Sequence, residues 1–265
     1  MAIEIFNRYE NKYLLDSATC AAVQARLAEH MMPDAHNRHG DRYAICNLYY
    51  DTADSHLIRT SLQKPPYKEK LRLRAYGVAR AEDTVYVEIK KKVRGLVNKR
   101  RSAMPLGIAE EFLGTGTLPV ITPEMNAQVV REAAYLLSHK SVRPAVYLAY
   151  ERMAWFGTDA HDLRVSFDSH IVSRRHDLSL ASPVSGTALL PPDTVLMEIK
   201  VAQSIPLWLA ELLSEYQIYP TSFSKYGREY MGQLIQHPAP LVHPAPQRIE
   251  AFAALQHKKG AFQYA

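Results

Sequence analysis

The stretch 70–101 constrains the fold most, because charged side chains recur in it at every second residue. This is the spacing of a β-strand, in which alternate side chains point to opposite faces. The first strand would set Lys70, Arg72 and Arg74 on one face and Leu71, Leu73 and Ala75 on the other. After a turn over 77–83, the returning strand would set Tyr86, Glu88, Lys90 and Lys92 opposite Val85, Val87 and Ile89. Taken alone, this pattern indicates an antiparallel hairpin with one face in the core and its charges in water.

The same alternation of charged residues recurs along the chain. It sets Arg8, Glu10 and Lys12 on one face, Arg164 and Asp168 on a second, and Glu198 with Lys200 on a third. Faces exposed to water usually mix hydroxyls, amides and charges of both signs, whereas these are dominated by Arg and Lys. A sheet closed into a barrel would gather them in a polar lumen, and helices would have to cover its apolar outer face. We therefore predict an α+β fold, in which a closed antiparallel β-barrel with a charged lumen is surrounded by α-helices.

Other segments supply the further strands and helices of this fold. We expect strands over 3–15, 44–51, 143–156, 162–173 and 194–201. We expect helices over 18–31, 55–62, 104–113, 125–139 and 205–216, and a loop over 182–193. Asp16 or Ser17 would cap the first helix, and most of the helices have the apolar spacing of covering elements. Arg152 and Arg164, on two strands joined through 157–159, are expected to point inward.

Composition narrows the setting of this chain. Its 265 residues are 47% hydrophobic, which suits one large domain or two small ones with a sizeable core. A formal charge of +5 is only mildly basic, so we expect no nucleic acid as partner. Cys20 and Cys46 lie in unlike contexts without a zinc-ligand spacing and are predicted to be reduced core residues. Walker, Rossmann and GxSxG motifs are missing from the sequence.

The two ends of the sequence bear on location and domain organisation. A charged strand, and not an apolar signal core, is expected near the start, and no run approaches the ~20 apolar residues that span a bilayer. We expect a cytoplasmic protein without a transmembrane segment, while association with an unidentified membrane partner stays open. Residues 1–236 would form the folded domain, and 237–265 a Pro-containing tail with a short helix over 247–257.

The run Ser222–Arg228, SFSKYGR, combines two hydroxyls, a Lys and an Arg with aromatic residues. Hydroxyl and cationic donors so close in sequence suit the binding of a phosphate group. A polar loop that caps the following helix is an equally good interpretation, and the sequence leaves both open.

Seven segments, taken in order, resemble a known family. They are RYENKYLL at the start, NLYYDT from Asn47, KLRLRAYG from Lys70, VEIKKK from Val87, YERMAW followed by DLRVSFDS, LMEIK from Leu196 and SFSKY from Ser222. Together they resemble VTC domains, the polyphosphate polymerase branch of the triphosphate tunnel metalloenzymes, which are related to the CYTH proteins. The resemblance spans roughly residues 3–233. It implies an antiparallel eight-stranded tunnel surrounded by helices, in which Arg and Lys hold a triphosphate and carboxylates hold Mn²⁺ or Mg²⁺.

The resemblance assigns roles to individual positions. It implies that phosphates are bound by Lys12, Arg72, Arg74, Lys90, Lys99, Arg152, Arg164, Ser224 and Lys225, and that a metal is bound by Glu198. Two positions depart from the pattern. The wider tunnel family begins with an ExExK motif, in which Arg8 here replaces the first Glu, and the eukaryotic polymerases have a further Lys where this chain has Ser222. Neither an SPX domain nor a membrane segment is expected within the 265 residues.

The charge balance supports the same interpretation without the resemblance. The proposed lumen contains Arg8, Lys12, Arg72, Arg74, Lys90, Lys99, Arg152, Arg164, Lys200 and Lys225 against Glu10, Glu88, Asp168 and Glu198. Ten cations against four carboxylates leave six net positive charges in a confined space, which a polyanion would balance. Glu198 is expected to be the best metal ligand. The other three carboxylates would either help to hold the metal or pair with Arg and Lys.

These patterns predict a metal-dependent enzyme that transfers the γ-phosphate of ATP to a growing inorganic polyphosphate chain. Phosphoryl transfer needs mainly in-line positioning and charge neutralisation, which Arg side chains and a divalent ion supply. The predicted catalytic residues are Lys12, Arg72, Arg74, Lys90, Arg152 and Arg164, and further phosphates would be bound by Arg8, Lys99, Lys200, Ser224 and Lys225. A tripolyphosphatase or nucleoside triphosphatase of the same fold, an adenylate cyclase, and a polyphosphate-binding module without activity remain alternatives.

Overall fold

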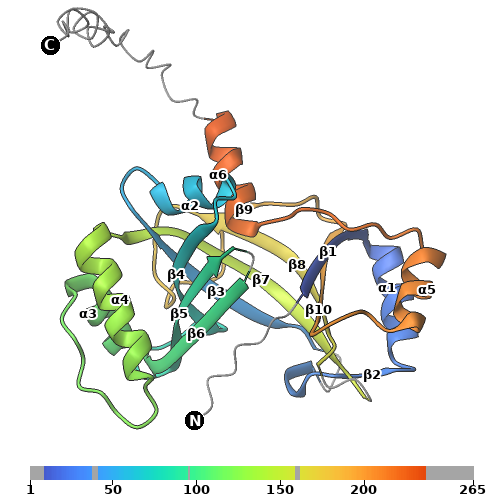
Figure 1. Cartoon of the computed structure of the whole chain (residues 1–265), viewed down its shortest axis with the longest axis horizontal. Helices are drawn as coiled ribbons and strands as arrows, with labels where there is room; N and C mark the ends of the chain where they lie inside the picture. The colour runs from blue at the N-terminus through green and yellow to red at the C-terminus, as the bar shows by residue number, and fades with distance from the viewer. Residues whose placement is uncertain (1–8, 38–40, 95, 159–161, 237–265) are drawn as a thin grey trace, which may run out of the picture.

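One antiparallel sheet organises the protein. The computed structural model describes residues 9–37, 41–94, 96–158 and 162–236. Eight strands follow the order β1-β10-β8-β7-β3-β4-β5-β6 (Figure 1). Their bounds are β1 Tyr9–Asp16, β3 Tyr43–Asp51, β4 Tyr67–Tyr76, β5 Thr84–Val93, β6 Leu96–Pro105, β7 Arg143–Gly157, β8 Arg164–Arg174 and β10 Thr194–Val201. Two short strands extend the sheet, β2 (Met31–Pro33) beside β7 and β9 (Thr187–Ala188) beside β8.

Three pairs of helices surround the sheet. They are α1 Ser17–Leu27, α2 His56–Leu62, α3 Leu106–Thr115, α4 Ala127–Lys140, α5 Leu207–Glu215 and α6 Lys225–Gln236, with a 3₁₀ helix at Ala35–Asn37. Figure 1 shows α3 and α4 at one end of the molecule, α1 and α5 at the opposite end, and α2 beside α6 between them. Within the described residues, no helix is both long and apolar enough to cross a membrane.

The alternation in the sequence gives β4 and β5 one apolar and one charged face, as predicted. Leu71, Leu73, Val85 and Val87 are fully buried and pack with the apolar sides of α3 and α4 in one core. Complete burial of such a side chain contributes roughly 1.5–3 kcal/mol to folding, so this face is firmly fixed toward the helices. The turn between the two strands begins at Gly77, whose φ of 85° lies in the left-handed region that glycine adopts without strain.

A second core covers the apolar face of β1, β8 and β10. Phe167, Met197 and Ile199 pack there with buried residues of α1 and α5, among them Val23 and Leu209. The predicted cap of α1 is confirmed, because the Asp16 carboxylate accepts a hydrogen bond from the Thr19 backbone N–H at 2.7 Å. Helices therefore cover the apolar face of the sheet at both ends of the molecule.

A third core lies on the charged side of the sheet and covers part of that side. Leu148, Tyr49 and Leu196 pack there with Ile58 of α2 and Tyr226 of α6. Asp51 anchors both helices, because its carboxylate accepts hydrogen bonds from the Leu57 N–H at 2.8 Å, the Ile58 N–H at 3.0 Å and the Tyr226 hydroxyl at 2.9 Å. The charged face is thus bordered by a plug of apolar and aromatic side chains, which the period-two pattern did not predict.

The predicted closure of the sheet into a barrel is not confirmed. Among the residues that the structure describes, no hydrogen-bonded ladder joins β1 to β6, the first and last strands of the order. The sheet nevertheless brings its two ends together, since Lys90 on β5 lies close enough to Glu10 on β1, near the opposite end of the order, to lower the pKa of Glu10. A curved sheet and a closed barrel bury the same outer face, so the alternation in the sequence does not distinguish them.

Most predicted elements are confirmed, with differences at their boundaries. The strand over 194–201, the short helix after Ser55, the long helix after Asn126 and the β7–β8 hairpin all lie where expected. Helix α1 ends at Leu27 and not near Met31, because Met31 is buried instead by pairing of β2 with β7. The predicted loop 182–193 also contains the short strand β9.

The region after the central hairpin differs more. Residues 96–105 form a third strand, β6, so Met104 ends a strand where a helix was expected to begin. Pairing with β5 buries Met104 in the core under α3, which begins two residues later. The predicted strand over 3–15 is described only from Tyr9, and the predicted tail 237–265 with its helix lies outside the described residues.

Candidate functional site

Strand pairing sets the basic side chains of β4, β5 and β6 in rows across the charged face. The register places Lys68 beside Lys92, Lys70 beside Lys90 and Lys99, Arg72 beside Glu88 and Arg101, and Arg74 beside Tyr86. Residues directly opposite in an antiparallel pair have Cβ atoms about 4.5–5.5 Å apart, and like charges there destabilise the sheet. Two of these rows hold only lysines as charged residues, so this part of the face carries a concentrated positive charge.

Glu88 orders the cations of the arginine row. Its buried carboxylate accepts a hydrogen bond from Arg72 Nε at 2.5 Å and lies 2.8 Å from Lys99 Nζ and 3.8 Å from Arg74 Nε. Burial alone would raise the pKa of Glu88, but these three cations hold it well below its usual range. Glu88 is therefore ionised, and it positions three cations, two from β4 and one from β6.

Residues of β3 and β7 hold the other sides of the two arginines. Arg72 Nη1 donates to the Tyr49 hydroxyl at 3.1 Å. Arg74 Nε donates to Asn47 Oδ1 at 2.9 Å, and its Nη2 donates to the Tyr150 hydroxyl at 3.3 Å. Both guanidinium groups are thus fixed by neutral side chains in addition to Glu88.

Glu198 is the centre of a second charged group, on β1, β10 and β7. Its two carboxylate oxygens lie 3.2 Å from Lys225 Nζ, 3.2 Å from Lys200 Nζ, 3.5 Å from Arg152 Nη2 and 3.6 Å from Lys12 Nζ. Burial would raise the pKa of this carboxyl, but Lys225, Lys200 and Arg152 together hold it well below its usual range. One carboxylate therefore gathers four cations that are far apart in the sequence.

Asp168 holds two of the same cations from the neighbouring strand β8. It is completely buried, accepts from Arg152 Nε at 2.6 Å and from Nη2 at 2.7 Å, and also accepts from Lys225 Nζ. Against the effect of burial, Arg152 and Lys225 lower the pKa of Asp168, and Asp168 raises that of Lys225. Both carboxylate oxygens are thus used by cations, so Asp168 fits the ion-pairing role that the sequence left open for it.

Glu10 links the two charged groups. Lys12 Nζ lies 3.2 Å from its carboxylate, and the same ammonium donates to the Phe223 carbonyl at 2.9 Å. Burial would raise the pKa of Glu10, but Lys200, Lys12 and Lys90 lower it. Because Lys90 belongs to the lysine rows, the two groups face one another across the curved sheet.

The lysine rows are electrostatically strained without a ligand. Burial, together with the nearby Lys90, Lys68 and Lys12, lowers the pKa of Lys70 to about 8 against the opposing effect of Tyr49. Burial likewise lowers the pKa of Lys99 to about 8, although Glu88 opposes it. The Lys99 side chain is nevertheless 43% exposed, so solvent and small anions reach it. Cations that water reaches, but that the surrounding protein desolvates, are poised to receive an external anion.

The structure brings together most of the residues that the sequence predicted. Charged contacts unite Lys12, Glu10, Glu198, Lys200, Arg152, Asp168 and Lys225 in one group, and Arg72, Arg74, Glu88 and Lys99 in the other, with Lys90 facing both. Arg164 pairs with Asp34 at 3.3 Å, while its buried Nε has no hydrogen-bond partner among the described residues. Arg8 lies outside the described residues.

Ser224 lies at the start of α6. Its hydroxyl accepts from the Gly227 N–H at 3.2 Å and its carbonyl from the Arg228 N–H at 2.7 Å, so it caps the start of α6. This is the alternative that the sequence left open for the SFSKYGR run. Its neighbour Lys225, in contrast, is buried between Asp168 and Glu198.

Sequence reasoning missed several residues of this face. They are Lys68, Arg101, Asn47, Tyr49 and Tyr150, whereas Lys70 and Lys92 were placed on the face but given no role. The parity that identified Arg72 also places Lys68 and Lys70 on its face, so the two lysines had a signal in the sequence. Asn47, Tyr49 and Tyr150 had none, because their contacts with the arginines depend on which strands pair.

A divalent cation fits only one part of this arrangement. Within the described ranges, no three His, Cys, Asp or Glu side chains are grouped as a metal site. Glu88 belongs to the arginine group, and both oxygens of Asp168 are used by cations. Glu198 is also paired with cations, but it has a second carboxylate beside it, because it lies close enough to Glu10 to raise the pKa of that carboxyl. Mg²⁺ is commonly held by one or two carboxylates together with substrate phosphates, and this pair fits that requirement.

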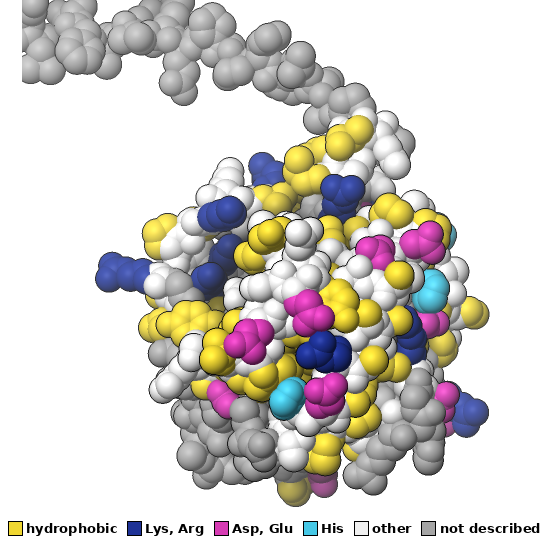
Figure 2. All heavy atoms as spheres, turned by 90° about the vertical axis from the view of Figure 1, so that its right-hand side faces the viewer, with side chains coloured by type: hydrophobic (Ala, Val, Ile, Leu, Met, Phe, Trp, Pro, Cys, Tyr) yellow, Lys and Arg dark blue, Asp and Glu magenta, His cyan; other side chains and the backbone are white. Residues whose placement is uncertain are grey.

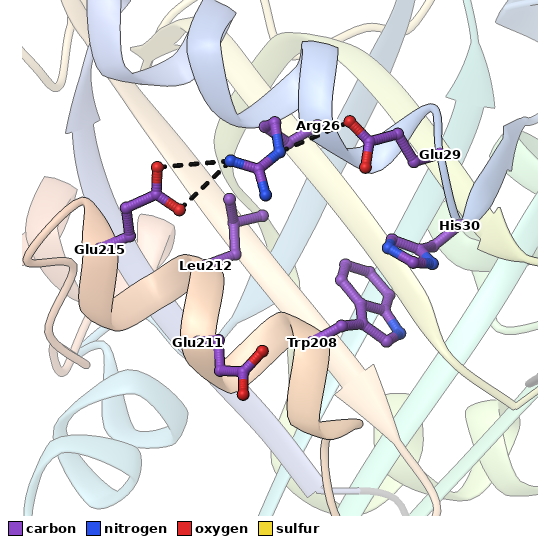
Figure 3. A pocket seen from close by; sticks show the side chains of 7 residues that line it. All are labelled: Arg26, Glu29, His30, Trp208, Glu211, Leu212 and Glu215. Carbon is purple, nitrogen blue, oxygen red and sulfur yellow. Dashed lines mark hydrogen bonds and ion pairs between the residues drawn. The ribbon is translucent and has the colours of Figure 1, made fainter.

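Two surface cavities lie away from the charged face. One of about 240 Å³ is lined by Arg26, His30, Trp208 and three glutamates at the end formed by α1 and α5 (Figure 3). Figure 2, a view onto that end, shows Asp and Glu side chains gathered near its centre. The other, of about 770 Å³, lies between β6, α3 and the segment 117–125, with a mostly apolar lining. Neither presents the basic residues described above.

Comparison with known proteins identifies the family. The sequence matches the VTC domain over residues 7–231, and the chain therefore belongs to the VTC domain family. No curated protein matches the chain.

The chain is also similar to several solved structures, at low identity and low TM-score. A candidate adenylate cyclase from Bacillus halodurans is 16% identical with a TM-score of 0.48, over 87% of this chain and 96% of that one. A candidate adenylyl cyclase from Hippeastrum, described as having a dominant triphosphatase activity, is 14% identical with a TM-score of 0.46, over 89% and 99%. The Mimivirus capping enzyme triphosphatase is 8% identical with a TM-score of 0.33, over 78% and 89%. Because these values are low, the family assignment rests on the VTC match.

Proposed function

We propose that this protein is a metal-dependent polyphosphate polymerase, which transfers the γ-phosphate of ATP to a growing inorganic polyphosphate chain. Membership of the VTC domain family supports a phosphate substrate. The observation that carries the proposal is the series of successive basic rows along β4 and β5. It continues from Arg74 and Arg72 through the row of Lys70 and Lys90 to that of Lys68. The activity is assigned to residues 1–236, with the sheet curved around the substrate as a tunnel.

The extent of these rows favours a chain over a single triphosphate. Lys68 and Arg74 are six residues apart on one strand, which corresponds to about 20 Å at the usual rise of 3.3 Å per residue. Over this distance Glu88 is the carboxylate of β4 and β5 that faces the basic side chains, and Glu10 of β1 faces Lys90. A triphosphate bound at the arginines would leave the distant row of Lys68 and Lys92 free, whereas a polymer would neutralise that row as well.

The reaction itself needs little from the protein beyond positioning and charge. An oxygen of the terminal phosphate of the chain forms a bond to the γ-phosphorus of ATP. The bond between that phosphorus and the β–γ bridging oxygen breaks, and its electron pair leaves with ADP. Arg72, Arg74 and Arg152, each held by fixed partners, would neutralise the negative charge of the transferred group without having to reorganise.

Glu198 and Glu10 would hold the divalent ion, Mn²⁺ or Mg²⁺. When bound, this ion supplies neutralisation of phosphate oxygens in the transition state. Glu198 is paired with four cations in this structure, and phosphate oxygens of a bound substrate would take over the pairing of Lys12, Lys200 and Arg152. The carboxylate therefore serves as a temporary counter-ion for the cations of the site.

Product analysis tests this proposal. The purified chain is incubated with ATP and Mn²⁺, and the products are separated on a gel before and after treatment with an exopolyphosphatase. We expect ADP together with polymers that the exopolyphosphatase degrades, and short polyphosphate should remove any initial lag. Release of orthophosphate equal to the ADP formed, with no polymer, would indicate a triphosphatase, and pyrophosphate with cyclic AMP would indicate a cyclase. Binding of polyphosphate without turnover would indicate a binding module.

The chain offers a matched control for the residues of the face. Lys90 and Lys91 are adjacent on β5 and point to opposite sides, and Lys91 pairs with Glu132 of α4 at 2.9 Å. Lys90→Ala should lower polymer formation about tenfold or more, whereas Lys91→Ala should leave it unchanged. Equal effects of the two substitutions would contradict the assignment of the charged face as the active site.

A further inference from the structure

Strand β3 presents two buried polar residues to the arginines of the site. Asn47 is completely buried and Tyr49 is 8% exposed, and the register sets them directly opposite Arg74 and Arg72. The residues between and beside them, Cys46, Leu48 and Tyr50, point to the opposite side and lie in the core under α3 and α4. One strand thus has a purely packing face and a face that contacts the arginines.

The contacts of these two residues with the arginines are closely similar. The Tyr49 hydroxyl accepts a hydrogen bond from Arg72 Nη1, while the Glu88 carboxylate accepts one from Arg72 Nε. Asn47 accepts from Arg74 Nε, and its own amide donates to the Leu148 carbonyl at 3.0 Å, which fixes it to β7. Within the described residues, Arg72 Nη2 and Arg74 Nη1 donate no hydrogen bond to the protein. Each arginine is therefore held by two of its nitrogen atoms and retains one for a ligand.

Burial of these polar groups is unfavourable for folding by itself. An amide or hydroxyl taken out of water costs about 1–3 kcal/mol in proteins unless it is hydrogen-bonded. Here the hydrogen bonds that offset this cost come from Arg72 and Arg74, which lie on the charged face of the sheet. Apolar residues at both positions would fill the same space without such a cost, so the stability of the sheet does not require an Asn and a Tyr here.

The surroundings of Tyr49 differ sharply from those of Tyr50. Burial would raise the pKa of Tyr49, but Arg72, Lys70 and Arg74 on β4 lower it to about 8. Its other neighbours are the Tyr226 ring of α6 at 5.0 Å and the apolar residues of the third core, including Val146 and Ile58. Burial raises the pKa of Tyr50, with no cation to oppose it. Two adjacent tyrosines of one strand therefore sit in opposite electrostatic surroundings.

We propose that Asn47 and Tyr49 are positioning residues of the polyphosphate site, which hold Arg74 and Arg72 with one N–H face turned to the phosphate. The inference rests on the proposed function, because it takes the ligand to be a polyphosphate anion.

Tyr49→Phe tests this role, with Tyr50→Phe as the matched control. The first substitution removes one oxygen atom from the charged side, and the second removes one from the packed side of the same strand. Binding of tripolyphosphate, measured by calorimetry, should weaken about tenfold in Tyr49→Phe, the usual size for loss of one hydrogen bond to a charged group. Tyr50→Phe should bind as the wild type does.

A double-mutant cycle separates positioning from a general structural effect. If Tyr49 acts through Arg72, Tyr49→Phe should have little further effect on binding in an Arg72→Ala background. A full tenfold loss in that background would overturn the inference. So would unchanged binding by Tyr49→Phe alone.

An ultraviolet titration of tyrosine ionisation makes the test independent of ligand binding. One tyrosine should ionise near pH 8, and its transition should vanish in Tyr49→Phe but not in Tyr50→Phe. Failure of the wild type to bind tripolyphosphate would overturn both the proposed function and this inference. Binding by the wild type, with an early transition that Tyr49→Phe does not remove, would overturn the placement of Tyr49 beside the arginines and leave the proposed function intact.

Discussion

The two charged groups of the site treat their cations in opposite ways. On β1, β8 and β10, the buried carboxylates Asp168 and Glu198 surround Lys225 and raise its pKa against the effect of burial. On β4, β5 and β6, Lys70 and Lys99 are also desolvated, but their pKa falls to about 8. The same residue type is therefore satisfied in one half of the face and strained in the other.

This difference indicates where the charge of a ligand is missing. In the first half the protein supplies its own anions, so its arrangement is stable when empty and a ligand must exchange for them. In the second half the cations outnumber Glu88, and an external polyanion would remove the repulsion between them. We infer that the first half would hold the metal, that Arg72 and Arg74 of the second half act with Arg152 on the reacting phosphate, and that the lysine rows of the second half hold the chain.

The largest expected effect is on stability, where the two halves should respond in opposite directions. Asp168→Asn leaves Arg152 and Lys225 buried with one carboxylate fewer, which should cost about 3–5 kcal/mol. Lys70→Met removes a strained cation and should instead raise the melting temperature by a few degrees. Thermal unfolding without ligand measures both. Destabilisation by Lys70→Met as large as that by Asp168→Asn would contradict the comparison.

Glu198→Gln should affect turnover more than the fold. The amide keeps the size of the side chain but removes the charge that would attract the metal. We expect turnover at limiting Mn²⁺ to fall about 100-fold or more, the size observed for loss of one strong transition-state interaction. Steady-state rates and circular dichroism measure the two properties. Glu132→Gln is the control, because Glu132 pairs with Lys91 and Arg100 on the side of the sheet opposite the charged face. Unchanged turnover of Glu198→Gln would remove Glu198 from the metal site.

Loss of both arginines should abolish most ligand stabilisation. Tripolyphosphate at a hundred times its dissociation constant adds about 2.7 kcal/mol to the stability of the wild type, which raises the melting temperature by several degrees. Arg72→Ala with Arg74→Ala should remove most of this shift. Lys91→Ala with Arg100→Ala, on the opposite side of the sheet, should keep it. A full shift in the first double variant would mean that these arginines do not contact the ligand.

A smaller effect is expected from pH. Tripolyphosphate binding should weaken about tenfold between pH 7 and 9, because Lys70 and Lys99 lose their protons near pH 8. Without ligand the sign is reversed. The folded pKa of these lysines lies below the unfolded value, so the penalty for protonating them is complete below pH 8 and is relieved as the pH rises toward 10.5.

Arginine substitutions at the same positions supply the control for the pH effect. Because Arg stays protonated throughout this range, Lys70→Arg with Lys99→Arg should flatten the dependence of binding on pH. Calorimetric titrations at several pH values measure it. An equally steep decline in the arginine variant would assign the effect to other groups, of which Tyr49 is the nearest candidate.

Much of this site was predictable from the sequence, because parity along a strand fixes which side chains share a face. Arg72, Arg74 and Glu88 were placed in this way, and so was Glu198 beside Lys200. Strand β6 was harder to predict from the sequence, since its segment NKRRS does not alternate between charged and apolar residues. Its place is determined by pairing with β5 and by the burial of Met104 under α3.

The remaining features depend on contacts between strands that are distant in sequence. The plug formed by Leu196, Leu148 and Tyr226 lies on the charged side, where parity predicts lumen residues of any polarity. The roles of Asn47 and Tyr49 follow from the register of β3 with β4, which no local pattern specifies. Closure of the sheet likewise depends on its curvature, and the alternation is the same in open and closed sheets.

Dependence of affinity on chain length tests the central claim most directly. Calorimetry compares tripolyphosphate with long-chain polyphosphate on the wild type and on Lys68→Ala with Lys92→Ala, which removes the row most distant from the arginines. We predict that the wild type binds the long chain more tightly, at equal concentration of chains. The double variant should lose much of this advantage and still bind tripolyphosphate normally. Equal affinity of the wild type for both ligands, or equal weakening of both by the double variant, would contradict a face built to hold a chain.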